Sequence, residues 1–235
     1  MMTGKTALVA GGTGGLGRAV TQAFLAAGAN VIVTYRKDQE FAELNSSGGN
    51  PATLVGYKVD VTDEAAVQQL IERILSDHQK LDILVNAVGG YTGGKTLWDS
   101  NAKVLDDMLA LNLRSGFLLS RAAAKAMLQE RRGAIVNVAS KAALAHEAGM
   151  AAYAASKAAA VALMDSLAAD LKGTGVRVNS ILPSIIDTEI NRRAMPSADF
   201  HKWPKPEEIA RVILFLCSDD AKIIHGAAIP VYGDS

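Results

Sequence analysis

The chain has 235 residues, about half of them apolar, and equal numbers of basic and acidic side chains give it a formal net charge of zero. This length suits one large domain, and the balanced charge argues against a nucleic-acid or anionic-membrane surface as a partner. No apolar run reaches the ~20 residues of a membrane-spanning helix, and the N-terminus shows no signal-peptide pattern. Cys217 is the only cysteine and lies in an apolar run, so we predict a buried thiol in a cytoplasmic protein.

Short apolar segments rich in β-branched residues alternate with longer helical patterns along the chain. The expected strands are 6–10, 31–34, 53–59, 81–85, 134–138, 176–182 and 228–231. The expected helices are 15–27, 39–45, 64–78, one long helix near 101–129, 151–172 and 206–216. Strands that are apolar on both faces are typical of a buried parallel sheet. We therefore predict a single α/β domain with a doubly wound, seven-stranded, mostly parallel sheet flanked by helices.

Two segments do not fit this alternation. Residues 46–51 form a short turn cluster. Residues 187–206 are polar, contain three prolines and follow the sixth expected strand. Because ligands of doubly wound sheets bind beyond the carboxyl ends of the strands, we expect this long insertion to be a substrate lid.

A glycine-rich turn joins the first strand to the first helix. It reads Gly11-Gly12-Thr13-Gly14-Gly15-Leu16-Gly17. Glycines let a backbone approach a pyrophosphate, whose charge then meets the N-terminus of the helix. A tight loop without a ligand is the alternative, but the position between the first strand and helix favours a dinucleotide site.

The end of the second strand bears on the choice of cofactor. NAD sites usually present an acid there for the ribose hydroxyls, whereas this chain reads Tyr35-Arg36-Lys37 before its first carboxylate at Asp38. Arginine binds a phosphate with two parallel hydrogen bonds. We therefore expect NADP to be preferred, with NAD possible; the alternative is that Arg36 and Lys37 are solvated loop charges.

Tyr153 and Lys157 stand four residues apart, which places them on one face of the expected helix. A phenol with a pKa of about 10 is a poor acid–base catalyst, and a nearby ammonium group favours the phenolate. Ser140, at the end of a strand, could donate a hydrogen bond to the same substrate oxygen. Asn112 could bind a water that links Lys157 to solvent.

Together these motifs resemble the short-chain dehydrogenase/reductase family along the whole chain. The resemblance implies a Rossmann-type fold and reversible hydride transfer between NAD(P) and a carbonyl or alcohol, which we expect to run as a reduction. It implies that Tyr153 is the acid–base group, Ser140 orients the carbonyl, Lys157 holds the nicotinamide ribose and lowers the pKa of Tyr153, and Asn112 holds a relay water. The predicted cofactor contacts are Gly11, Thr13, Gly14, Gly15, Leu16, Gly17, Tyr35, Arg36, Asp60, Val61, Asn86, Ala87, Gly89, Pro183, Ile186 and Thr188.

The chain departs from the family pattern at three positions near the cofactor. Ala10 replaces a threonine that ties the glycine loop down, and Ala87 replaces an asparagine after the fourth strand. Ser184 replaces a glycine in the Pro-Gly motif after the sixth strand. None removes a reacting group, so we expect effects on rigidity and affinity.

A second group of residues falls in segments expected to surround the nicotinamide. An aromatic and thioether lining suits a flat or apolar carbonyl substrate. The alternatives are that Phe200 and Trp203 fasten the lid and that His146 is a solvated loop residue. Trp98 is expected to pack at the start of its helix, and the other histidines lack metal-ligand spacing, so no metal is predicted. The predicted pocket residues are Tyr91, Leu144, His146, Met150, Met195, Phe200 and Trp203.

Two rival functions and the assembly state stay open at this stage. Segments 88–94, 141–144, 148–150 and 191–200 resemble dihydropteridine reductase, a branch of the same superfamily that lacks the serine and asparagine kept here as Ser140 and Asn112. A catalytically idle NAD(P)-sensing module is the other rival. The resemblance also implies a homo-oligomer, a tetramer or dimer built on the two long helices and the last strand.

Overall fold

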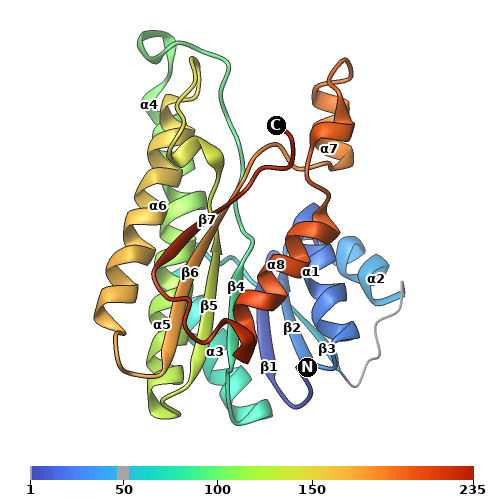
Figure 1. Ribbon diagram of the computed structural model, residues 1–235, viewed down its shortest axis with the longest axis vertical. Coiled ribbons are helices and arrows are strands. Elements are labelled where there is room, and N and C mark those ends of the chain that lie inside the picture. Colours follow the sequence, from blue (N-terminus) through green and yellow to red (C-terminus); the bar gives the residue numbers. More distant parts are fainter. Residues whose placement is uncertain (1, 47–52) are drawn as a thin grey trace.

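Seven parallel strands form one sheet in the order β3-β2-β1-β4-β5-β6-β7 (Figure 1). The computed structural model describes residues 2–46 and 53–235. The chain winds outward from β1 to β3, returns to β4 beside β1, and winds outward in the other direction to β7. The strands are β1 (Thr6–Ala10), β2 (Asn30–Tyr35), β3 (Leu54–Lys58), β4 (Ile83–Asn86), β5 (Gly133–Val138), β6 (Val176–Pro183) and β7 (Ala227–Val231).

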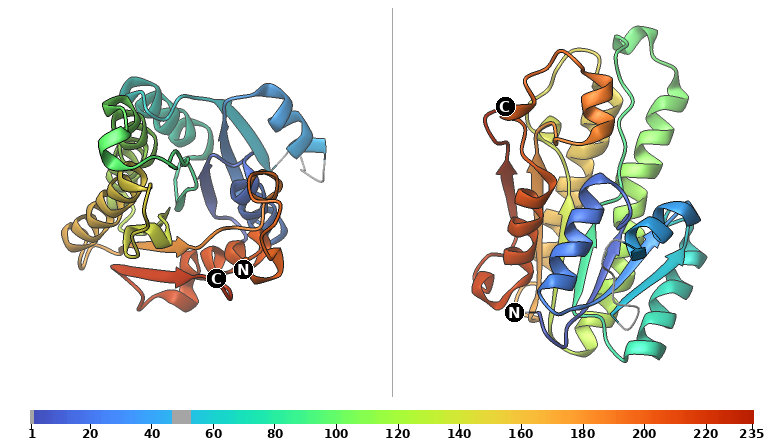
Figure 2. Two further views of the ribbon diagram at one scale, coloured as in Figure 1. Left: turned by 90° about the horizontal axis from the view of Figure 1, so that it is seen from above. Right: turned by 90° about the vertical axis from the view of Figure 1, so that its right-hand side faces the viewer.

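Helices cover both faces of this sheet (Figure 2). Helices α1 and α8 pack on one face, and α3, α5 and α6 on the other. The predicted doubly wound α/β fold is therefore confirmed, with a sheet that is wholly parallel. The helices are α1 (Gly15–Ala26), α2 (Asp38–Ser46), α3 (Glu64–His78), α4 (Ala102–Leu109), α5 (Ser115–Gln129), α6 (Ala151–Asp170), α7 (Glu189–Ala194) and α8 (Pro206–Cys217).

Successive side chains of β1 explain why the strand sequences are apolar without alternation. Val9 joins the core under α1 and α8 with Phe24, whereas Leu8 joins the core under α3 and α5 with Met127. Neighbouring residues of a strand point to opposite faces, so a sheet covered on both sides needs apolar residues at every position. Each large side chain fully buried in this way contributes about 1.5–3 kcal/mol.

The carboxyl ends of the strands lie at the upper edge of the sheet in Figure 1. Strand order reverses between β1 and β4, and a doubly wound sheet opens a crevice at that point. Helix α7 lies at this same edge, above α1 (Figure 1). The fold thus brings the glycine loop, the residues after β4 and β5, and the segment after β6 to one edge.

The expected single helix at 101–129 is interrupted. Between α4 and α5 the backbone forms a π-helical turn over Ala110–Arg114. An extra residue in one turn changes the direction in which side chains leave the helix, and such turns are frequent at functional sites. Asn112 lies inside this turn.

Smaller expectations also need correction or fall outside the described residues. Trp98 does not pack at a helix start, since it stands in a short 3₁₀ turn with its side chain 85% exposed. Segment 187–206 is less irregular than expected because it contains α7 and a 3₁₀ turn at Phe200–Lys202. Most of the expected turn cluster at 46–51 lies outside the described residues.

Cys217 is buried in the core under α8, and burial raises the pKa of its thiol to about 12. A thiol that stays protonated is a poor nucleophile. Over residues 2–46 and 53–235, no helix combines the length and the apolar character that crossing a membrane requires. The same residues contain no cluster of three or more His, Cys, Asp or Glu arranged to hold a metal ion.

Candidate active site

The glycine loop has the backbone geometry of an anion cradle. Gly11 has a φ of +73°, which favours glycine, and a Cβ on Gly17 would lie 2.0 Å from the Gly11 oxygen. Helix α1 starts at Gly15 without a side-chain capping hydrogen bond. The N–H groups of its first turn are therefore available to an anion, which the helix dipole also favours.

Two threonines that the sequence analysis did not single out hold this loop. The Gly11 N–H donates to Thr34 Oγ1 at 3.0 Å, and Thr21 Oγ1 donates to the Gly12 oxygen at 3.1 Å. The loop therefore has side-chain ties although Ala10 stands in place of the family's threonine. A threonine near the end of the second strand, facing a glycine loop, is the signal that could have found Thr34.

A cavity of about 290 Å³ extends from the glycine loop along the carboxyl ends of β2, β3 and β4. It brings together eight of the predicted cofactor residues with five others. The predicted ones are Gly11, Thr13, Gly14, Tyr35, Arg36, Val61, Ala87 and Gly89. The additional ones are Thr34, Glu40, Val59, Val88 and Leu111.

Charged groups at the far end of this cavity are paired with one another. Arg36 Nη2 lies 3.4 Å from Asp60 Oδ1, in an exposed ion pair. The same carboxylate accepts hydrogen bonds from the Thr62 hydroxyl at 2.7 Å and the Thr62 N–H at 2.9 Å. Hydrogen bonds from Thr62, and to a smaller extent the charge of Arg36, lower the pKa of Asp60.

Glu40 is a carboxylate in this cavity that the sequence analysis missed. It accepts a hydrogen bond from Thr13 Oγ1 at 3.2 Å and pairs with Lys37 Nζ at 3.1 Å. The first turn of α2 carries it across from the glycine loop. A search for carboxylates in the first helical turn after β2 is the signal that could have found Glu40.

The other predicted cofactor residues lie at the ends of β4 and β6. Asn86 is buried, donates to Asn137 Oδ1 at 2.9 Å and accepts from the Val88 N–H at 3.2 Å. This holds the turn that carries Ala87 and Gly89. Leu16 is buried at the start of α1, and Pro183 is the last residue of β6. The oxygen of Ile186 accepts the Thr188 N–H, and the Thr188 methyl group lies 2.9 Å from where a Cβ on Gly15 would stand.

Lys157 is almost fully buried, at 5% exposed. Its Nζ donates to the Val138 oxygen at 3.1 Å, and burial lowers its pKa to about 8. A Cβ on Gly89 would lie 2.9 Å from Lys157 Nζ and 3.0 Å from Asn112 Oδ1. Both polar atoms therefore border the glycine that follows β4.

Tyr153 stands one turn before Lys157 on α6. Burial raises the pKa of its phenol, while a hydrogen bond with Ser140 acts in the opposite direction. Lys157 is not among the groups that shift the pKa of Tyr153 here, whereas the family resemblance implied that it lowers this pKa; its ammonium group bonds to the Val138 carbonyl. Ser140 lies two residues after β5, where it caps a 3₁₀ turn at Lys141–Ala143 by accepting the Ala142 N–H at 3.2 Å.

Asn112 uses its side chain to join three elements. Its Oδ1 accepts the Gly90 N–H at 2.9 Å, and its Nδ2 donates to the Gly90 oxygen at 3.1 Å and to Ser156 Oγ at 3.0 Å. Ser156 lies between Tyr153 and Lys157 on α6. The π-helical turn thus links the loop after β4 to the helix that carries the predicted reacting groups.

The predicted substrate residues fall into two groups. Tyr91 stacks edge-on against Tyr153 with ring centroids 5.1 Å apart, and the Gly94 N–H donates to the Gly149 oxygen beside Met150. In the second group, Phe200 and Trp203 pack against each other at 5.0 Å. Leu144 and His146 are exposed in the loop before α6, and Met195 is partly buried after α7. Their roles toward a substrate stay predictions.

Comparison with known proteins decides the family. The family model described as short chain dehydrogenase matches residues 5–198. The chain belongs to the short-chain dehydrogenase/reductase family. It is therefore an NAD(P)-dependent oxidoreductase that acts between an alcohol and a carbonyl group, as predicted.

Relatives within this family match nearly the whole chain. A D-threitol dehydrogenase from Mycolicibacterium smegmatis is 36% identical over 99% of this chain and 93% of its own length. A 3-oxoacyl-[acyl-carrier-protein] reductase from Thermotoga maritima is 30% identical over 99% of this chain and 98% of its own.

Solved structures of family members have the same fold. The structure of ElxO with NADP bound has a TM-score of 0.91 and 27% identity, covering 97% of each chain. An NAD⁺-bound xylitol dehydrogenase has a TM-score of 0.91 and 25% identity, covering 99% of each chain. The family thus includes members with either cofactor.

Proposed function

We propose that this short-chain dehydrogenase/reductase reduces an apolar or flat carbonyl compound with NADPH, with Tyr153 as the proton donor. The observation that carries the proposal is the cluster of Tyr153, Ser140, Lys157 and Asn112 beside the open glycine cradle. Tyr153 and Lys157 come from α6, Asn112 from the π-helical turn and Ser140 from the segment after β5. Hydrogen bonds to Gly90, Val138 and Ser156 hold Asn112 and Lys157 in place.

Each member of the cluster has a distinct part in the reaction. Burial keeps the Tyr153 phenol protonated, which suits a group that donates a proton to a carbonyl oxygen. The Ser140 hydroxyl, which is bonded to that phenol, orients the same carbonyl oxygen. Lys157 holds the nicotinamide ribose, and Asn112 holds a water that returns protons toward Tyr153. The bound nicotinamide supplies the hydride.

The cradle fits the pyrophosphate of a dinucleotide. A Cβ at Gly12 or Gly17 would collide with neighbouring atoms, whereas the nearest atom to a Cβ on Gly14 is 3.5 Å away. Gly14, at the uncapped start of α1, is thus less crowded than Gly12 and Gly17. Gly15, Leu16 and Gly17 would bind the pyrophosphate through their N–H groups, and Ile186 and Thr188 would contact the nicotinamide carboxamide.

Opposing charges near Tyr35 set the choice between NADPH and NADH. An exposed ion pair such as Arg36–Asp60 is worth about 0–1 kcal/mol, so Arg36 is free to turn to a 2′-phosphate. Glu40 acts against it, since its carboxylate repels a phosphate and accepts hydrogen bonds from ribose hydroxyls. We propose that Arg36 prevails and NADPH is preferred, with NADH still accepted because of Glu40. Asp60 and Val61 would contact the adenine.

Opposite changes in cofactor preference are expected from Arg36→Gln and Glu40→Gln. Loss of a charge-assisted hydrogen bond of about 1.5–3 kcal/mol should weaken NADPH binding by about tenfold or more in Arg36→Gln and leave NADH nearly unchanged. Glu40→Gln should strengthen NADPH binding relative to NADH. Arg73→Gln is the matched control, because Arg73 has a similar exposed ion pair on α3. If Arg36→Gln weakened the binding of both cofactors equally, Arg36 would not contact the 2′-phosphate.

We propose that the central part of segment 187–206 is the substrate lid. Both ends of the segment are fastened, because the Asp187 N–H donates to the Pro204 oxygen at 3.0 Å and Trp203 is only 6% exposed. Trp203 therefore anchors the lid. Helix α7 lies between the anchors and carries Ile190, which is 76% exposed. An exposed isoleucine at this edge gains burial when the lid closes over an apolar substrate.

Ile190→Ser should raise KM by about tenfold, since burial of most of such a side chain contributes at least about 1.5 kcal/mol. The melting temperature should stay the same, because the side chain is already in water. Ile223→Ser is the matched control, as Ile223 is also largely exposed but lies before β7. Hydrogen exchange of the α7 amides should slow only with cofactor and substrate both bound; slow exchange in the free enzyme would show a fixed loop.

Turnover with a panel of substrates tests the proposed function. The panel combines NADPH or NADH with 3-oxoacyl thioesters and aromatic ketones, NADP⁺ or NAD⁺ with threitol, and NADH with a quinonoid dihydropterin. We expect reduction of at least one carbonyl compound. Turnover of the pterin alone would support a dihydropteridine reductase, which the relatives do not favour. Tight cofactor binding with no turnover of any substrate would support a catalytically idle NAD(P)-sensing module.

We further propose a cytoplasmic homo-oligomer. Phe117 and Leu128 are exposed apolar residues on α5, one of the long helices expected at the interface. The buried, unpaired Cys217 agrees with a reducing compartment. Sedimentation of the purified chain distinguishes a tetramer, a dimer and a monomer.

A further inference from the structure

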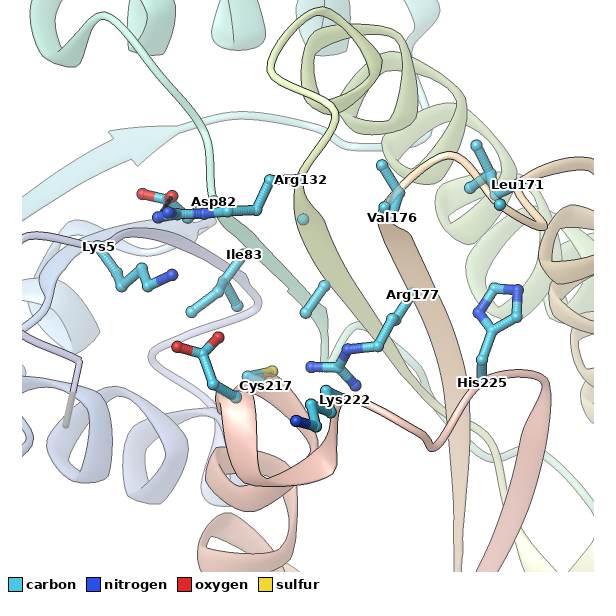
Figure 3. A pocket seen from close by; sticks show the side chains of 15 residues that line it. Lys5, Asp82, Ile83, Arg132, Leu171, Val176, Arg177, Cys217, Lys222 and His225 are labelled. Atoms are coloured by element: carbon cyan, nitrogen blue, oxygen red, sulfur yellow. Dashed lines mark hydrogen bonds and ion pairs between the residues drawn. The ribbon is translucent and has the colours of Figure 1, made fainter.

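A second cavity, of about 360 Å³, lies at the opposite edge of the sheet from the active site (Figure 3). It is bordered by the amino ends of β1, β4, β5 and β6 and by the last residue of α8. A cavity of this size falls within the range of small-molecule sites. Nothing in the proposed reaction uses it, because the reacting groups stand at the carboxyl ends of the strands.

Cations predominate around this cavity. Lys5, Arg132, Arg177 and Lys222 line it, against the carboxylates of Asp82 and Asp219. His225 adds no charge in this arrangement, because its Nδ1 accepts the Val178 N–H and its Nε2 faces the Ala168 oxygen. The lining thus carries two positive charges in excess.

Asp82 is already satisfied and does not balance the remaining cations. It is buried and accepts hydrogen bonds from the Thr6 N–H at 2.8 Å and from Arg132 Nη2 at 2.8 Å. Lys80 Nζ lies 3.3 Å from the same carboxylate. This cluster has a structural task, since it joins the start of β1 to the start of β5. Asp219 is the one other carboxylate in the lining that can balance Lys5, Arg177 and Lys222.

Arg177 is the central group of the cavity. Its guanidinium donates to the Ser218 oxygen at 3.0 Å and the Ile224 oxygen at 3.3 Å, which fix its plane. Within residues 2–46 and 53–235 it forms no ion pair within 4.0 Å. Burial lowers its pKa, and the charge of Asp219 acts in the opposite direction. A partly buried cation without a paired anion is costly. Figure 3 shows Lys5 and Arg177 extending toward each other from opposite sides, with Ile83 between them and Lys222 beside Arg177.

We propose that this cavity is a second binding site, for a small organic molecule that carries a phosphate group. A phosphate dianion balances the two excess charges, and a planar guanidinium binds phosphate oxygens through two parallel hydrogen bonds. The apolar side chains of Ile83, Leu171 and Val176 in the lining provide a surface for the rest of the molecule. Because the site lies at the opposite edge from the cofactor crevice, both can be filled at once.

Calorimetric titration of the full chain with ribose 5-phosphate tests this proposal, with inorganic phosphate and acetate as further probes. Titrations are made at low salt and with NADPH present, so that phosphate sites in the cofactor crevice are occupied. We expect Arg177→Gln to weaken ribose 5-phosphate binding by tenfold or more and Lys222→Gln by severalfold. Arg211→Gln, which removes an exposed arginine of α8 outside the cavity, should leave binding unchanged.

Other results decide against the site or its chemistry. Absence of binding at millimolar ribose 5-phosphate, or the same affinity in all three variants, would overturn the proposal. Acetate that binds as tightly as phosphate would overturn the choice of a phosphate group. Arg177→Gln removes two hydrogen bonds to carbonyls and could lower stability. In that case the test uses Lys222→Gln and Lys5→Gln. These substitutions should not lower stability, because the side chains of Lys222 and Lys5 form no ion pair in the described residues.

Discussion

The Tyr153→Phe enzyme should bind its cofactor normally and turn over roughly 10²–10⁴ times more slowly, which is the contribution typical of a positioned acid–base group. Phenylalanine keeps the ring, including its edge-on contact with Tyr91 at 5.1 Å, and removes only the hydroxyl that bonds with Ser140. Single-turnover kinetics and cofactor titration on the same preparation measure the two effects separately.

Tyr91→Phe is the matched control for this substitution. It removes a phenol hydroxyl from the same pair of rings and leaves the ring contact in place. We expect its turnover to stay within a few-fold of the parent enzyme. A Tyr153→Phe enzyme that keeps most of its rate would show that Tyr153 is not the proton donor.

The direction of the pKa shift of Tyr153 predicts opposite pH profiles for the two reaction directions. Because burial raises the pKa of the phenol, the protonated form dominates at neutral pH. Reduction needs this form, so its rate should stay level at neutral pH and fall at alkaline pH. Oxidation needs the phenolate, so its rate should rise with pH. These profiles should be absent from the residual activity of Tyr153→Phe.

Most of the fold could be predicted because it rests on local patterns. The apolar strands 6–10 and 134–138 lie within one residue of β1 and β5, since a sheet covered on both faces demands apolar residues at each position. The π-helical turn at Ala110–Arg114 could not be predicted. It accompanies the bonds from Asn112 to the backbone of Gly90, and these depend on a loop distant in the sequence.

The site shows the same division between local and long-range information. The glycine loop and the Tyr153–Lys157 spacing are readable because each is one motif on one element. Glu40 was missed because only the docking of α2 brings its carboxylate to Thr13. The direction of the Tyr153 pKa shift was also missed. The spacing on α6 indicates that two side chains share a face, but only the structure shows that Lys157 bonds to Val138 instead.

Lys157→Met should lose cofactor affinity and turnover while it gains stability. Methionine keeps an unbranched stem in the buried space and removes the ammonium group, which is 5% exposed and bonded to one carbonyl. Loss of that group removes the proposed ribose contact and the charge beside the reacting groups. Turnover should therefore fall at least as far as in Tyr153→Phe, and cofactor binding should weaken, which Tyr153→Phe does not show. If Lys157→Met left cofactor affinity unchanged, Lys157 would not contact the nicotinamide ribose.

The gain in stability follows from the cost of burying the ammonium group. Its pKa is about 8 in the folded protein, against 10.5 for an exposed lysine, so below pH 8 the folded state bears a penalty on the order of 3 kcal/mol. Between pH 8 and 10.5 the unfolded chain binds a proton that the folded chain does not, so the penalty falls as the pH rises. Lys157→Met should thus melt several degrees higher at pH 7, and this difference should shrink above pH 8. Lys125→Met, which replaces an exposed lysine of α5, should have the melting temperature of the parent protein both at pH 7 and above pH 8. A lower melting temperature for Lys157→Met would show that its ammonium group stabilises the fold and does not burden it.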